Sequence, residues 1–153
     1  MKWDKFVFLL LDNALKYFFI SLPFFLVFYV FFRKTFSYKK IQIKFPGIKD
    51  YARESGFSTV SVIIFSIPPL LMLYSDTIRP YTTFYTSIDE HGALYFVLAF
   101  PLMLLMHDTY FYWAHRLMHH PWLFKKIHLV HHKSTNPSPW AAYAFHPFEA
   151  IAE

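Results

Sequence analysis

Histidines are concentrated in one stretch of the chain, and their spacing indicates a metal site. Seven of the nine histidines fall between residues 107 and 132, in the run HDTYFYWAHRLMHHPWLFKKIHLVHH. Imidazole is the commonest protein ligand for transition metals, and it titrates near neutral pH. His115 and His119 are four residues apart, so on a helix they lie one turn apart on the same face. The first part of this run therefore predicts a helix that presents two imidazoles together.

A second group of histidines follows Pro121, which is expected to end or kink that helix. In this group His128 and His131 are three residues apart, and His132 is adjacent to His131. With His120, the two groups place six imidazoles within 18 residues. One tetrahedral zinc takes about four ligands. The run therefore predicts either two metal ions or one ion and some histidines that do not bind it.

Three further residues are predicted to lie around the site. Asp108 precedes His115 by seven residues, close to two helical turns, and should share its face, where it can bind metal or orient a histidine. His107 is rotated away from that face by about a quarter turn and is predicted, with Asp108, to lie around the ligands. His146 either closes the site or only packs against it. The alternative for the whole group is a set of solvated histidines at the end of a membrane helix. No catalytic group separate from the metal ligands is predicted.

The runs HDTYFYWAHRLMHH, LFKKIHLVHH and NPSPWAAYAFHPFEA resemble the sterol desaturase and fatty acid hydroxylase superfamily. The resemblance runs from about residue 94 to residue 153 and is closest to the bacterial sterol-desaturase-like and C5-sterol-desaturase branch. It implies a non-haem di-iron centre that uses oxygen to hydroxylate or desaturate a lipid, either a sterol or a fatty acyl chain. It also implies a separate electron-donor protein. The metal ligands that it implies here are His115, His119 or His120, His128, His131 and His132, with His146 as a further candidate.

The sequence departs from that superfamily at its end. Family members carry another HxxHH cluster after a further membrane segment, and this sequence stops at Glu153. We therefore expect a C-terminally truncated chain, with an N-terminal membrane region over 1–92 and the front part of a catalytic domain over 93–153. Two other functions stay open. One is a zinc-dependent membrane lipid hydrolase, and the other is a non-catalytic remnant.

Composition indicates an all-α, multi-pass membrane protein. Of the 153 residues, 56% are hydrophobic and 23% aromatic, which is too apolar for an ordinary soluble domain. Membrane segments are predicted over 6–32 and over 57–74, the second kinked at Pro68 and Pro69. A third helix is predicted from 93 to 119. At about 40 Å it exceeds the hydrocarbon core of about 30 Å, so its histidine end should project from the bilayer.

Charge predicts which side each loop faces. The net charge is +5, and seven of the basic residues lie between 33 and 53. The loop over 75–92 carries mostly acidic charges. By the positive-inside rule the basic segment and the histidines should be cytosolic, in a bacterial inner membrane or the endoplasmic reticulum. A lipid-headgroup or partner contact is the alternative for the basic segment, in which 39–45 forms a short strand or an extended arm. Nucleic acid is not an expected partner, and the absence of cysteine excludes thiolate ligands.

Overall fold

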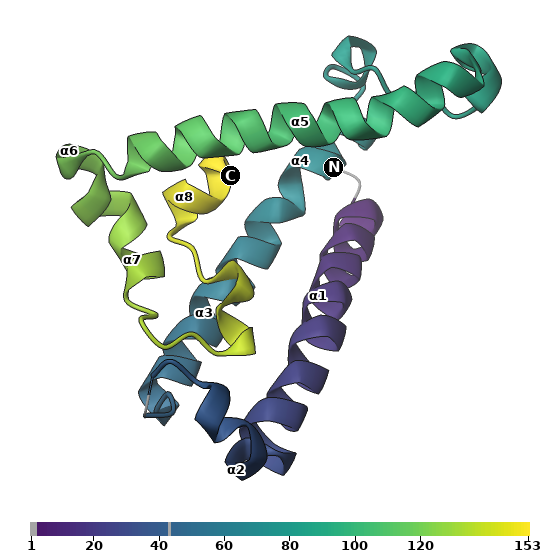
Figure 1. Ribbon diagram of the computed structural model, residues 1–153. Helices are drawn as coiled ribbons and strands as arrows, with labels where there is room; N and C mark the ends of the chain where they lie inside the picture. The colour runs from purple at the N-terminus through teal and green to yellow at the C-terminus, as the bar shows by residue number, and fades with distance from the viewer. Residues whose placement is uncertain (1–2, 43) are drawn as a thin grey trace.

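The structure, a computed structural model, describes residues 3–42 and 44–153, and all regular secondary structure in those ranges is helical (Figure 1). This confirms the predicted all-α class. The long helices are α1 (Trp3–Phe25), α3 (Ile48–Phe65), α4 (Ile67–Tyr74) and α5 (Gly92–Met118). The short ones are α2 (Arg33–Phe36), α6 (Pro121–Leu123), α7 (Leu129–His132) and α8 (Pro147–Ala152). Segments η1 (Leu26–Phe31) and η5 (Phe124–His128) are π-helical, and η2 (Ser37–Lys39), η3 (Arg79–Tyr81), η4 (Ile88–Glu90) and η6 (Pro139–Tyr143) are 3-10 helices.

Three helical stretches are long and apolar enough to cross a membrane, as predicted. They are Trp3–Phe31, Ile48–Tyr74 and Gly92–Met118. The second begins at Ile48 rather than at residue 57, because its charged first turns are satisfied locally. The backbone N–H of Gly47 donates to Asp50 at 3.0 Å, and Arg53 donates to the same carboxylate at 2.9 Å. Charged residues at the start of this helix therefore do not prevent it from forming.

Proline interrupts the second stretch where the sequence predicts a kink. The helix breaks at Ser66 and resumes with Pro68 and Pro69 in the first turn of α4. Proline lacks the N–H that the helix ladder requires, so the break falls just before the pair. The buried hydroxyl of Ser66 donates to the carbonyl of Val62 and accepts a hydrogen bond from Asn13 on α1 at 3.0 Å. A polar contact thus joins α1 to the break.

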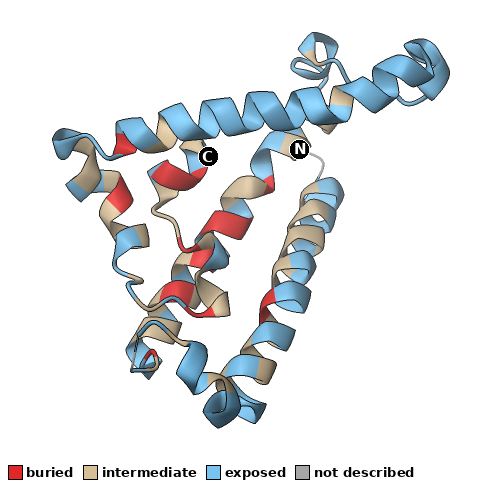
Figure 2. Cartoon of the chain, in the orientation of Figure 1, coloured by how far each residue is buried: buried red, intermediate tan, exposed pale blue. Residues whose placement is uncertain are grey.

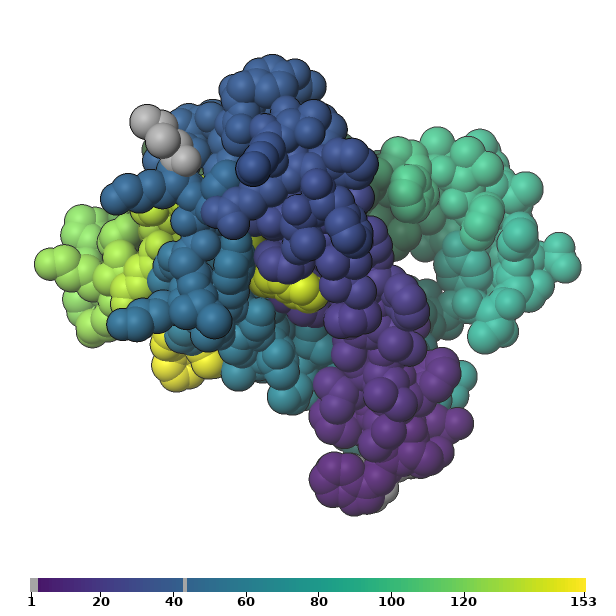
Figure 3. Space-filling view, turned by 90° about the horizontal axis from the view of Figure 1, so that it is seen from below, coloured from purple at the N-terminus to yellow at the C-terminus, as the bar shows by residue number. Residues whose placement is uncertain are grey.

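Segment η6 lies between α1 and α3 and joins them. The carbonyl oxygen of Trp140 accepts hydrogen bonds from Tyr17 on α1 at 2.7 Å and from Ser58 on α3 at 2.8 Å. The indole ring packs against Phe25, with 5.5 Å between ring centroids. From below, the yellow-green atoms of this part of the chain appear between the blue and purple N-terminal segments (Figure 3). Because α8 follows η6 closely, this contact also places α8.

The buried carboxylate of Glu54 holds the residue before η6. Glu54 on α3 is fully buried, and its Oε2 accepts hydrogen bonds from the Ser138 hydroxyl at 2.5 Å and the Ser138 N–H at 3.3 Å. A carboxylate removed from water needs such donors to offset the loss of hydration. The contact fixes the path of the chain from the histidine region back to the bundle.

Helix α5 has a different environment from α1 and α3. It runs crosswise over the upper ends of the other helices in Figure 1, and pale blue covers nearly all of it in Figure 2. No residue of its most apolar 18-residue window is buried. Only its last residue, Met118, is buried. The helix therefore contacts the rest of the described chain mainly at its two ends, and the histidine region lies at one of them.

The segment predicted as a short strand or an extended arm contains no strand in its described residues. Residues 40–42 and 44–46 lack regular structure, and residue 43 lies outside the described ranges. Side-chain contacts hold this segment instead. Lys40 donates to the side-chain oxygen of Asn136 at 3.0 Å, and Asn136 donates to the carbonyl of Lys44. These contacts tie the described part of the segment to the chain just before η6.

Candidate metal centre

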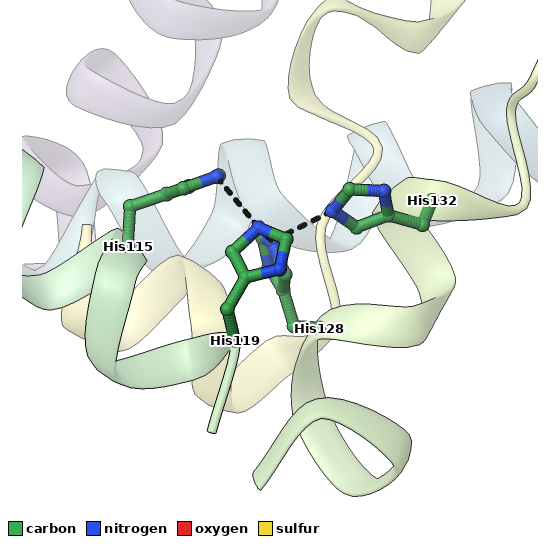
Figure 4. Close-up of side chains that lie close together, drawn as sticks. All are labelled: His115, His119, His128 and His132. Carbon is green, nitrogen blue, oxygen red and sulfur yellow. Dashed lines mark hydrogen bonds between the residues drawn. The ribbon is translucent and has the colours of Figure 1, made fainter. Parts of the chain in front are cut away.

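Two pairs of histidines, each at helical i, i+4 spacing, face one another in the structure. His115 and His119 come from the end of α5, and His128 and His132 come from η5 and α7 (Figure 4). The chain turns back between the pairs because α5 ends at Met118 and Pro121 starts a new helix. We call these residues the four-histidine set.

Three neighbouring distances within the four-histidine set match those between ligands of one metal ion. Neighbouring Nε2 atoms are 3.2 Å apart for His115 and His119, 3.2 Å for His119 and His128, and 3.0 Å for His128 and His132. All four ligand atoms lie within 4.8 Å of one another. Two nitrogens that are each about 2.1 Å from one ion lie about 3.0 to 3.4 Å apart at octahedral or tetrahedral angles. Four convergent imidazoles are therefore a donor set suited to a transition metal.

The protonation of the set also suits a metal. His128 is fully buried. Burial, reinforced by the neighbouring imidazoles, lowers the pKa of His128 to about 4. Burial is also the largest cause of the lowered pKa of His131 and of His132. Neutral imidazole is the form that binds metal, so His128 and His132 are ready to bind at neutral pH without losing a proton.

Helix α8 supplies a carboxylate to the back of His128. Glu149 is fully buried, and its Oε1 lies 2.7 Å from His128 Nδ1. Burial raises the pKa of Glu149 to about 8. A cation on Nε2 favours the arrangement in which Nδ1–H donates to the carboxylate, because the negative charge then offsets the positive one. This contact orients the ring and leaves Nε2 facing the other three histidines.

A second carboxylate, Glu153, lies behind His115. Its Oε1 is 3.7 Å from His115 Nδ1, beyond hydrogen-bond range, and its side chain is only 5% exposed. Burial raises the pKa of Glu153 to about 7. The sequence pattern predicts no role for Glu149 or Glu153. The only local signal for Glu149 is its position three residues after His146, where its Oε2 accepts the N–H of His146 at 3.3 Å at the start of α8.

The other residues predicted for the site make different contacts. His131 stacks on Phe145, with 5.4 Å between ring centroids. His120 and His146 each accept a backbone N–H at the start of a short helix, α6 and α8 respectively. His107 pairs with Asp108 at 3.3 Å, and both are exposed. The structure thus brings four of the seven predicted ligands together. The carboxylates beside rings of the four-histidine set are Glu149 and Glu153, whereas Asp108 lies beside His107.

A pocket of about 450 Å³ opens beside the four-histidine set. It is lined by His115, His119, Phe111, Tyr112, Asp108 and Arg116. Arg116 donates to the Tyr112 hydroxyl at 2.8 Å. An apolar wall with one cation and one anion at its edge suits a mostly apolar molecule that carries a small polar group. Asp108, which the sequence predicts to lie near the metal ligands, is one of the residues that line this pocket.

Comparison with known proteins gives consistent results over the histidine region. A family model described as fatty acid hydroxylase matches residues 100–153. Over 106 residues the chain is 34% identical to a Delta(7)-sterol 5(6)-desaturase of Gibberella zeae, covering 69% of this chain and 32% of that protein. Over 128 residues it is 33% identical to the Delta(7)-sterol 5(6)-desaturase of Leptosphaeria maculans, covering 81% and 33%. A relative from Aspergillus fumigatus is 42% identical over 77 residues, covering 50% and 22%.

The chain therefore spans about a third or less of the length of these relatives. No solved structure gives a significant match. The bacterial branch of the resemblance stays a prediction.

Proposed function

Because the chain belongs to the sterol desaturase and fatty acid hydroxylase superfamily, we propose that it functions as a membrane-bound oxidoreductase that hydroxylates or desaturates a lipid. The observation that carries this proposal is the four-histidine set, whose Nε2 atoms converge at the end of an apolar helix. The names of the relatives refer to sterol desaturation, which favours a sterol over a fatty acyl chain as the substrate.

The metal in this proposal is non-haem iron. The four-histidine set would hold one ion, and bound iron would supply the activation of oxygen for attack on an unactivated C–H bond. Within the described ranges, one group of three or more histidine or acidic side chains has metal-binding geometry. The resemblance also implies a second iron, and only the resemblance supports it.

The residues of this chain would position the substrate and the ligands. The pocket beside His115 and His119 would receive the apolar body of the lipid against Phe111 and Tyr112. Arg116 lies at the same pocket and can hold a polar group of the substrate. Glu149 keeps the His128 ring oriented by accepting its Nδ1–H. Helix α5, which is apolar and uncovered along most of its length, gives a lipid a route along the membrane to the pocket.

The proposal also includes a membrane location and a partner protein. Three candidate spans support a membrane protein. The basic residues over 33–53 and near the histidines support a cytosolic site, in an endoplasmic reticulum or bacterial inner membrane. A separate electron-donor protein would supply the electrons, as the resemblance implies.

The test is metal content together with oxygen-dependent turnover. The chain is purified in detergent, reconstituted anaerobically with Fe(II), and assayed for bound iron by mass spectrometry. A sterol and an electron donor are then added with and without oxygen, and oxidised products are measured. We expect bound iron and products that require oxygen.

Zinc binding with no iron uptake, together with lipid cleavage in the absence of oxygen, would instead support the hydrolase. A catalytic zinc takes about three protein ligands and one water, and three of the four histidines would be enough for it. Metal binding with no turnover of either kind would contradict activity in this chain and support a non-catalytic role.

A further inference from the structure

A second pocket lies away from the four-histidine set. Its volume is about 600 Å³, and it opens between the end of α1, η1 and η6. It shares no lining residue with the four-histidine set or with the pocket beside that set. In the view from below, the yellow-green part of the chain is recessed between the blue and purple segments (Figure 3). The proposed oxidation chemistry makes no use of this pocket.

The wall of this pocket is mostly aromatic and apolar. Phe24 and Phe28 stack with 6.2 Å between ring centroids, and Phe28 contacts Phe36 at 5.0 Å. The opposite wall is formed by Pro137, Pro139 and other residues of the η6 region. Non-helical backbone at membrane depth is tolerated where it is buried or lines a cavity. The pocket therefore has the chemistry of a site for a hydrocarbon chain.

The lining of the pocket also carries positive charge. Lys39 and Lys40 line it directly. Arg33 and Lys40 both lie over the ring of Phe45, at 4.1 Å and 4.4 Å from its centroid. Among the described residues, no carboxylate forms an ion pair with Arg33, Lys39 or Lys40. Cations held this close without a counter-charge favour the binding of an anion.

The pKa of Lys40 is consistent with positive charge that lacks a counter-charge. Burial, followed by the nearby charge of Arg33, lowers the pKa of Lys40 from its usual value. The Lys40 ammonium donates to Asn136 at 3.0 Å, and two of its three N–H groups stay available for another acceptor. A negative group at this position would reduce the repulsion between the two cations.

We propose that this pocket binds one anionic membrane phospholipid, with an acyl chain along the aromatic wall and the headgroup at Lys39 and Lys40. The occupant is a lipid because the pocket combines an apolar interior with cations in its lining, just after the first candidate span has ended. The lipid would bridge α1 and the η6 region. This proposal does not depend on the metal or on the oxidation reaction.

The experiment counts bound lipid on the detergent-purified chain by native mass spectrometry. Phosphatidylserine is the probe, and phosphatidylcholine with the same acyl chains is the neutral comparison. We expect one phosphatidylserine to stay bound under conditions that remove phosphatidylcholine. The double variant Lys39→Gln, Lys40→Gln should weaken phosphatidylserine binding by about 30-fold, since each cation contributes about fivefold. Glutamine keeps a donor for Asn136, so the fold is preserved.

The matched control is Lys125→Gln, Lys126→Gln, which removes two exposed cations outside the pocket. It should leave lipid binding unchanged. Equal weakening in both double variants would mean a general surface attraction and would overturn the proposal. Equal retention of the two lipids by the unmodified chain would overturn it as well.

A second variant tests the hydrocarbon part of the site. Ala142 lines the pocket and is exposed, so Ala142→Trp fills the cavity without removing a charge. We expect it to abolish retention of phosphatidylserine while helix content by circular dichroism stays unchanged. Inorganic phosphate alone should not compete with the lipid at millimolar concentration. Persistent lipid binding in Ala142→Trp, or displacement by phosphate, would show a headgroup site without an acyl-chain pocket and would contradict the proposal.

Discussion

His131 and His132 are adjacent in sequence, yet only one of them faces the other histidines. His132 is four residues after His128 and joins the four-histidine set, whereas His131 stacks on Phe145. We therefore expect His132→Ala to reduce metal affinity by at least about 100-fold, because one of the four ligands is lost. His131→Ala should change it by less than about threefold. Isothermal titration with Co²⁺ or Fe²⁺ measures both. Equal losses in the two variants would contradict this assignment.

The contact between Glu149 and His128 gives a second prediction. Glu149→Gln keeps the size of the side chain but removes the carboxyl group whose negative charge would offset a cation on Nε2 of His128. Loss of such a partner typically weakens metal binding by about 10- to 100-fold, and we expect an effect in that range. The same titration measures it, and the visible spectrum of bound Co²⁺ should shift because the ring orientation changes. Asp89→Asn, an exposed change away from the site, is the control and should have no effect.

Spacing in the sequence predicts some of the contacts around the histidines and misses others. Spacing correctly paired His115 with His119, because i, i+4 residues share a helix face regardless of the rest of the fold. Spacing could not choose between His131 and His132, since i, i+3 and i, i+4 partners of His128 are both near one helix face. The tertiary contact of His131 with Phe145 distinguishes them. Glu149 lies 21 residues after His128. Their contact depends on tertiary packing, which no local pattern reports.

Among the helices, the three candidate spans are predictable from the sequence, but the way they pack is not. Runs of apolar residues and the Pro68–Pro69 pair indicate where helices form and break, because both effects are local. The position of η6 between α1 and α3 depends on hydrogen bonds to Trp140 from residues more than 80 positions away. Turn-forming residues predict a connector before η6, but they do not predict that η6 packs between α1 and α3.

The anchoring of this connector by Glu54 gives a prediction about stability. Ser138→Ala removes the hydroxyl that donates to the buried Glu54 carboxylate. A buried acceptor that loses its partner costs about 1 to 3 kcal/mol, so the free energy of unfolding should fall by about that amount. Reversible denaturation in mild detergent, followed by tryptophan fluorescence, measures this change. Ser37→Ala, which removes an exposed hydroxyl bonded only within its own turn, should change stability by less than about 0.5 kcal/mol. An equal effect of both variants would contradict the anchoring role.

At the scale of the whole molecule, charge predicts how the chain is oriented in a membrane. The basic segment and the histidine region should lie on one side, and the loop with Asp89 on the other. The chain contains no cysteine, so single cysteines can be introduced without background. Lys34→Cys and Lys126→Cys should react with an impermeant maleimide only from the cytosolic side of sealed vesicles, and Asp89→Cys only from the opposite side. Labelling of all three from one side would contradict the predicted topology.

The contribution of α8 to the metal centre implies an order of events during biosynthesis. The four histidines leave the ribosome before Glu149 does, because α8 follows them in the chain. At that stage His128 lacks the carboxylate that lies 2.7 Å from its Nδ1 in the folded chain. The position of this carboxylate depends on α8, which packs against α3, and on η6, which bonds to α1 and α3. Under the proposed function, selective metal loading would therefore be a late step of maturation, after the N-terminal helices have been made.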